Sequence, residues 1–143
     1  MKHFAICISM AALLFGAPVD TAAAEALSAA SAINKAGRQR MLSQRIAKLY
    51  MCHQAGVRDA AVLDSLQQVK SEFKGALAEL KAAQQNTESI RQGLDATGTQ
   101  WQLLEYSLEN ADKPLAEFVA LTSEKILSTM DGVTAAYEGL PGK

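Results

Sequence analysis

The chain has few of the residues on which catalytic and metal sites depend. Among its 143 residues are two cysteines and two histidines, and one of each lies in the leader described below. Cys52 and His53 remain, so no disulfide forms within the mature chain. No Ser-His-Asp set, carboxylate pair or glycine-rich phosphate loop is visible. The sequence therefore predicts no catalytic residues and no enzyme.

The remaining soft ligands are adjacent, as Met51-Cys52-His53. Successive side chains on a helix point about 100° apart, so these three cannot bind one metal ion without a second chain. Haem is not expected either, because there is no Cys-x-x-Cys-His motif and no second histidine. We expect no metal and no cofactor. Cys52 is either buried, the favoured alternative, or available to cross-link two chains.

The N-terminus carries an apolar run of 13 residues (4–16), which is too short for a comfortable membrane span. Small side chains at residues 21–24 then fit a signal-peptidase site, with cleavage before Glu25. The sequence predicts a signal peptide over residues 1–24 and a periplasmic or secreted protein after cleavage near Ala24. An uncut membrane anchor is the less favoured alternative.

Acidic residues are missing from the first part of the mature chain. Residues 26–58 hold six basic and no acidic residues, whereas residues 59–143 hold seven basic and thirteen acidic ones. A cationic segment is thus set against an acidic remainder, and its expected ligand is an anion. Nucleic acid is not expected as a partner, because the positive region is short and the protein is exported.

Alternation with period two and hairpin signals such as Asn-Gly are also absent, so no strand is predicted. Apolar residues instead recur at spacings of three and four. A first helix is expected over residues 26–55, ended by Gly56, and a second after the N-cap Asp59. Thr97-Gly98-Thr99 predicts a bend or a late start of the third helix. Asp112-Lys113-Pro114 predicts a break before the fourth.

The apolar stripes of the second, third and fourth helices are Val62, Leu66, Val69, Phe73, Leu77 and Leu80; Ile90, Leu94, Trp101, Leu104 and Leu108; and Leu115, Phe118, Val119, Thr122, Ile126, Met130, Val133 and Tyr137. Four helices joined by short turns predict an all-α fold, an antiparallel four-helix bundle. We assign it to residues 25–138, followed by a flexible tail over residues 139–143.

The first helix has two faces when its side chains are placed at 100° intervals. Leu42, Ile46 and Leu49 form an ordinary core stripe. The other face consists of Ile33, Ala36, Gly37, Arg40, Gln44, Ala47 and Met51. We expect the first face to pack inside the bundle and the second, small and polar, to dimerise with a second copy.

Arg40 lies in the middle of the second face. Across a two-fold axis it would approach its own mate, and two guanidinium groups at close range repel and lose solvation. A small planar anion between them relieves the repulsion, and guanidinium donors suit nitrate or nitrite oxygens. Asn34 or Gln44 supplies a further donor, and Gly37 leaves its backbone accessible. The alternative is a solvated basic face without a ligand.

Residues 33–45, INKAGRQRMLSQR, closely resemble the signature of PilJ-type sensor domains, which occur in type IV pilus chemotaxis transducers and in nitrate/nitrite sensor kinases. They match every fixed position of the P-box of the nitrate sensors, I-N-x-A-G-x-x-R-M-x-S-x-R. The later helices resemble the family only in pattern and spacing. The resemblance implies a periplasmic four-helix bundle that dimerises through its first helix. It also implies one nitrate or nitrite on the two-fold axis between paired arginines.

Carried over residue by residue, the resemblance makes Arg40 the anion-binding arginine. The expected ligand-binding residues are Arg40, Gly37, Ala36 and Asn34. The expected supporting residues are Arg45, Gln44 and Lys35. Family members usually continue into a transmembrane helix and an output module, whereas this sequence ends at Lys143. We therefore expect the bound anion to act through a partner. The alternative is a ligand-free adaptor whose first helix docks on a membrane-bound PilJ-type receptor.

Overall fold

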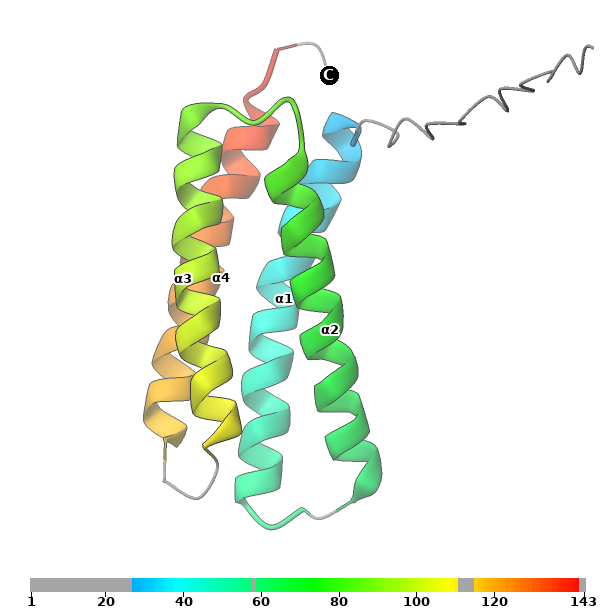
Figure 1. The fold of residues 1–143 in the computed structure, drawn as a ribbon, viewed down its shortest axis with the longest axis vertical. Helices are drawn as coiled ribbons and strands as arrows, with labels where there is room; N and C mark the ends of the chain where they lie inside the picture. The colour runs from blue at the N-terminus through cyan, green and yellow to red at the C-terminus, as the bar shows by residue number, and fades with distance from the viewer. Residues whose placement is uncertain (1–26, 58, 111–114, 142–143) are drawn as a thin grey trace, which may run out of the picture.

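The computed structural model describes residues 27–57, 59–110 and 115–141. Over these ranges the chain forms no strand and the α-helices α1 (Ala29–Gln54), α2 (Ala60–Ala82), α3 (Glu88–Glu109) and α4 (Ala116–Glu138). Figure 1 shows that successive helices run in alternating directions along one bundle. The predicted all-α four-helix bundle is confirmed. The predicted signal peptide and Pro114 lie outside the described residues.

Local sequence sets the helix boundaries. Ser28, Asp59 and Thr87 are side-chain N-caps of α1, α2 and α3. The carboxylate of Asp59, for example, accepts a hydrogen bond from the Ala61 amide at 2.9 Å, which satisfies one of the free N–H groups at a helix start. Gly56, just after α1, has φ +90°, a conformation that glycine adopts without strain. The predicted N-cap Asp59 and the predicted stop at Gly56 are confirmed.

The predicted late start of α3 is wrong, because the helix runs unbroken through Gly98. The hydroxyls of Thr97 and Thr99 donate to backbone carbonyls four residues earlier, at 2.9 and 3.2 Å. Thr97 is fully buried, and its hydroxyl lies 3.3 Å from the Met130 sulfur in α4. Tertiary packing therefore outweighs the cost of about 1 kcal/mol that a glycine imposes on a helix.

The core is built from the apolar stripes of all four helices. Its fully buried large side chains include Leu42, Ile46, Tyr50, Phe73, Leu80, Ile90, Leu94, Leu104, Ile126, Met130 and Tyr137. The rings of Phe73 and Trp101 stack with centroids 4.5 Å apart and join α2 to α3. Phe118, which the sequence places in the fourth stripe, is instead 41% exposed, so that part of the prediction is wrong.

The four helices do not pack equally. α1 makes its most extensive contacts with α4, α4 also packs on α3, and α1 on α2, whereas α2 and α3 make the fewest contacts of these neighbouring pairs. None of the helices in the described ranges is long and apolar enough to cross a membrane. The bundle therefore has one tight interface, between α1 and α4, and one loose interface, between α2 and α3.

A buried hydrogen bond closes one end of the bundle. The hydroxyl of Tyr137 in α4 donates to the side-chain oxygen of Asn86, in the turn before α3, at 2.5 Å. Burial raises the pKa of Tyr137 to about 12. A phenol in this position stays neutral because the charged form would lose its hydration.

Candidate anion-binding site on α1

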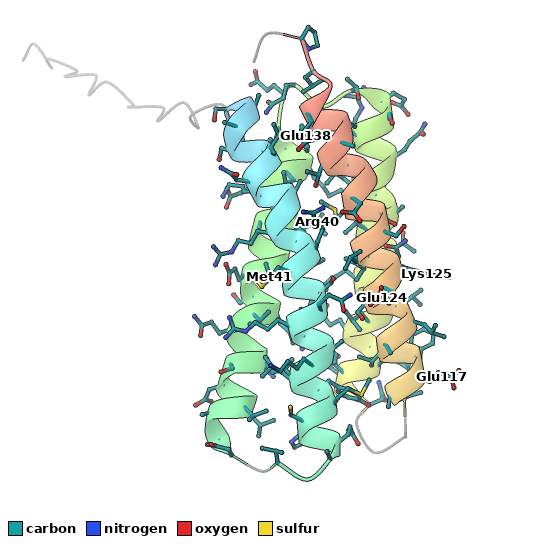
Figure 2. All side chains as sticks on the ribbon, turned by 180° about the vertical axis from the view of Figure 1, so that it is seen from behind. Arg40, Met41, Glu117, Glu124, Lys125 and Glu138 are labelled. Carbon is teal, nitrogen blue, oxygen red and sulfur yellow. The ribbon has the colours of Figure 1, made fainter. Side chains whose placement is uncertain are left out.

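Arg40 extends from α1 along the interface with α4 (Figure 2). Its Nη1 forms an ion pair with the carboxylate of Asp131 in α4, and its Nε lies 3.4 Å from the Gly37 carbonyl oxygen, one turn earlier. Nη2 takes part in neither contact. The Arg40 side chain is 42% exposed. Its guanidinium group therefore lies at the surface, as predicted, but it already has a carboxylate partner.

A shallow hollow of about 380 Å³ opens beside this guanidinium group. We call it the Arg40 hollow; it is lined by Gly37, Arg40, Met41, Gln44, Leu127 and Asp131. Met41 is 47% exposed at its edge. The hollow thus combines one cation, one carboxylate, one amide and an apolar rim on a surface that the single chain leaves open.

Gln44 contributes an unsatisfied donor to the Arg40 hollow. It lies one turn beyond Arg40 on α1, and its side-chain nitrogen is buried without a hydrogen-bond partner among the described residues. A buried donor without a partner costs free energy. Because Gln44 lines the hollow, its amide would become a second donor for an anion at Arg40 once the side chain turned outward.

A family model matches residues 21–134, well over half of the chain; the family is PilJ, described as the N-terminal domain of type IV pili methyl-accepting chemotaxis transducers. The chain belongs to the PilJ family. The match confirms the resemblance seen in residues 33–45 and extends it over all four helices. PilJ is a sensory domain and not a catalytic family. No curated protein and no solved structure matches the chain.

Two of the small residues predicted on the dimerising face of α1 lie where no partner can reach them. Ala36 is 0% and Ala47 8% exposed in the single chain, so the prediction that both are available to a second copy is wrong. They lie on the side of α1 that packs in the bundle core. Small side chains there allow neighbouring helices to approach closely, which fits the extensive contact between α1 and α4.

The remaining predicted ligand residues divide between the hollow and the open surface. Gly37 lines the hollow, and a Cβ built on it would lie 3.9 Å from Arg40 Nη2. This is ordinary contact, so alanine would fit at position 37. Asn34 is exposed but does not line the hollow. The structure therefore brings Gly37 and Gln44 to Arg40 and leaves Asn34 apart from them.

The basic residues of α1 lie on different sides of the helix. Lys35 pairs with Glu79 of α2 at 2.8 Å, and Arg38 pairs with Glu72 of the same helix. Arg45 is exposed and forms no ion pair with any residue in the described ranges. Lys35, predicted as a supporting residue, therefore faces α2 and stabilises the fold away from Arg40.

Asp131 is the residue that the sequence argument missed. It belongs to an acidic row in which Glu117, Glu124, Asp131 and Glu138 recur every seven residues along α4; Figure 2 labels the other three members of the row. Such spacing keeps side chains on one side of a helix. The row was a visible signal that α4 presents carboxylates on one side. Nothing in the sequence showed that this side lies against Arg40.

The soft ligands at the end of α1 remain separate. Cys52 is half-buried and free, which lies between the two predicted alternatives. The Nδ1 atom of His53 is buried without a hydrogen-bond partner in the described part of the chain. Within those same residues no three His, Cys, Asp or Glu side chains gather as a metal site would require.

Proposed function

We propose that this PilJ domain is an exported binding module for a small anion, nitrate or nitrite. One anion is held between the Arg40 side chains of two copies related by a two-fold axis. The observation that supports this most is the position of Arg40. Its half-exposed guanidinium borders an open hollow and has an unpartnered amide, that of Gln44, beside it.

The free edge of the guanidinium group suits this role. Nη1 and Nε are held by Asp131 and the Gly37 carbonyl, so Nη2 is the atom directed to a ligand. The two contacts lie on either side of Nη2 and orient the planar group before the anion arrives, which lowers the entropy cost of binding. A dimer adds a second Nη2 donor, and the negative charge of one anion offsets the repulsion between the two guanidinium groups.

Calorimetric titration of the mature chain, residues 25–143, with nitrate and nitrite tests the proposal, with chloride as the control. We expect heat that saturates near one anion per two chains. Arg40→Ala should abolish binding and leave the helical content unchanged, because the side chain lies outside the core. Arg38→Ala is the matched control: it removes an arginine from the same helix, paired instead with Glu72 of α2, and should bind as the wild type does.

One observation favours a second candidate function. Asp131 already neutralises Arg40 within the single chain, and Met41 and Leu127 give the same hollow an apolar rim. A ligand-free adaptor would use this surface to dock on a protein, such as a membrane-bound PilJ-type receptor. Absence of heat with all three anions, from a folded sample, would favour this function. Titration with a purified receptor domain would then show binding that Met41→Glu weakens.

In either case we propose a periplasmic location and an output that passes through a partner protein. If the protein is an anion-binding module, the partner contacts the dimer. If it is a ligand-free adaptor, the partner binds α1 directly. The two are separated by Arg40→Ala, which removes the anion site, and by Met41→Glu, which adds a charge to the exposed rim without touching the guanidinium group.

A further inference from the structure

A second hollow is lined by residues of α2 and α3, and these two helices lie on the side of the bundle away from the interface of α1 with α4 (Figures 1 and 2). It measures about 640 Å³. We call it the Lys70 hollow; it is lined by Gln67, Lys70, Ser71, Lys74, Gly75, Glu105 and Glu109. It lies at the loosest helix interface of the bundle. A Cβ built on Gly75 would meet no atom within 4 Å, so the α2 wall is open there.

Lys70 is the residue that needs an explanation. It is only 9% exposed, yet its nearest carboxylate oxygen in the described part of the chain, Glu109 Oε1, lies 3.8 Å from its Nζ. This separation exceeds hydrogen-bond distance. An ammonium group has three donors and loses hydration on burial. Lys70 Nζ therefore has a carboxylate nearby but no hydrogen-bond partner among the described residues, and it is not among the fully buried side-chain atoms, so a ligand in the hollow can reach it.

The two walls of the hollow carry opposite charges. Lys70 and Lys74 lie four residues apart on α2, and Glu105 and Glu109 lie four residues apart on α3. Lys74 Nζ lies 3.2 Å from Glu105 Oε1, and its side chain is 56% exposed. Exposed ion pairs of this kind contribute little to stability. A ligand that replaces the ion pair between Lys74 and Glu105 therefore costs the protein little stability.

Charge selects the class of ligand. The four side chains sum to zero, so a simple anion or a simple cation meets as much repulsion as attraction in the hollow. A molecule with one group of each sign meets complementary charge on both walls. Its carboxylate would also supply the acceptor that Lys70 lacks, and charge-assisted hydrogen bonds are stronger than neutral ones.

We propose that the Lys70 hollow binds a small zwitterion of the amino-acid class. The ligand carboxylate lies at Lys70 and Lys74, and its ammonium group at Glu105 and Glu109. The site shares no residue with the Arg40 hollow. It is therefore independent of the proposed function, and Arg40→Ala leaves it intact.

Trp101 supplies a direct probe of the site. It is the only tryptophan of the chain and lies on α3 one turn before Glu105, stacked on Phe73 of α2. Its indole nitrogen is buried without a hydrogen-bond partner in the described residues. A ligand that draws the walls of the Lys70 hollow together alters the surroundings of this ring. Binding at Arg40, on the remote side, does not.

The test titrates the mature chain with each of the twenty protein amino acids to about 10 mM, which covers dissociation constants in the millimolar range. Trp101 fluorescence and the melting temperature are the readouts. We expect a saturable change with at least one amino acid. Sodium acetate and ethylammonium chloride, which carry one charge each, should bind at least about tenfold more weakly.

Two variants locate the site. Lys70→Met keeps the aliphatic chain but removes the charge, and should weaken the binding of that amino acid by about tenfold or more. Lys81→Met is the matched control. It removes a lysine from the same helix that also pairs across to α3, with Asp95 at 2.7 Å, but does not line the hollow. It should bind as the wild type does.

Three results would overturn the proposal. One is a folded wild-type protein that responds to none of the amino acids. Another is wild-type affinity in Lys70→Met, and the third is equal loss in Lys81→Met. Should Lys70→Met fail to fold, Glu109→Gln replaces it, because that side chain is 63% exposed. Glu109→Gln should weaken the binding of the amino acid but not the binding of acetate. An unchanged affinity for the amino acid would contradict the proposed pairing of its ammonium group with Glu109.

Discussion

Under the proposed function, Asp131 determines how strongly Arg40 attracts an anion. Asp131→Asn keeps the size of the side chain and removes a negative charge close to the proposed ligand. The ion pair is 42% and 49% exposed on its two sides, so its loss should cost at most about 1 kcal/mol of folding stability. We expect nitrate affinity to rise about tenfold, which corresponds to about 1.4 kcal/mol. Calorimetry of the variant measures it.

Glu124→Gln is the control for this prediction. Glu124 lies seven residues before Asp131 in the same acidic row, is exposed and forms no ion pair with a described residue. It should change nitrate affinity by less than about twofold, because solvent screens a more distant charge. Weaker nitrate binding in Asp131→Asn would show instead that the carboxylate orients Arg40 more than it competes with the anion.

Tyr137 should make the stability of the bundle depend on alkaline pH. The phenol has an ordinary pKa of 10.0, and burial raises it to about 12 in the folded chain. Between these values the unfolded chain releases the proton and the folded chain does not, so stability is complete below pH 10 and falls as pH rises toward 12. The loss should reach about 2 to 3 kcal/mol. Urea unfolding at several pH values measures it.

Tyr137→Phe separates this effect from the titration of the lysines. The variant should lose about 1 kcal/mol at pH 7, because Asn86 loses its hydrogen-bond partner. Its stability should then fall less steeply than that of the wild type between pH 10 and 12. Parallel pH profiles for the two proteins would show that Tyr137 does not titrate differently on folding.

The two sides of α1 illustrate what a helical pattern can and cannot tell. Placing the side chains of α1 at 100° intervals correctly predicted that Leu42 and Ile46 lie in the core and Arg40 outside it. The prediction was wrong for Ala36 and Ala47. Alanine has a small apolar side chain that packs equally well in the core of one chain and between two chains, so its position on the helix does not tell the two apart. Which flank of a helix a neighbour covers depends on contacts between distant segments. Arg40 and Asp131 are 91 residues apart in the chain.

The interface of α3 with α4 has little spare room. A Cβ on Gly93 would lie 2.5 Å from Val133 Cγ2, and Val133 is nearly fully buried. A branched side chain in the core cannot move aside easily. Gly93→Ala should therefore destabilise the bundle by about 1 to 3 kcal/mol, although alanine is the better helix former. Thermal and urea unfolding measure this.

Gly132 is the matched control on the facing helix. It is exposed in the interior of α4, and a Cβ there would meet no atom within 4 Å. Gly132→Ala should stabilise the fold by about 0.5 to 1 kcal/mol, because it removes the entropy cost of a helical glycine. If both variants stabilise the protein, α3 and α4 have more freedom to separate than their packing indicates.

The fold of the whole molecule was predictable because each apolar stripe is long and regular. Leu66, Phe73 and Leu80, for example, mark one side of α2 without interruption and are all buried. The proposed site could be predicted only in part: the motif gives Arg40 and Gly37, and the helix face adds Gln44. The Lys70 hollow had no such signal, because its four charges come from two helices whose separation the sequence does not encode locally.

The oligomeric state joins the Arg40 site to the behaviour of the whole molecule. If one anion binds only where two chains meet, nitrate favours the dimer over both the free chain and the unfolded chain. At a concentration one hundred times the dissociation constant the stabilisation is about 2.7 kcal/mol. Shared between the two chains of the dimer, that raises the melting temperature by roughly 5 °C. Sedimentation at increasing nitrate should show the dimer fraction rising over the same concentration range.

Arg40→Ala should lose both effects together, and Arg38→Ala neither. The melting temperature and the sedimentation together show whether the anion site is formed by one chain or by two. A melting temperature that rises with nitrate in a chain that sediments as a monomer would mean that one copy holds the anion by itself. The Nη2 edge of Arg40 and the Gln44 amide would then form the whole site. A dimer that nitrate does not affect would instead assign the exposed rim at Met41 to contact between proteins.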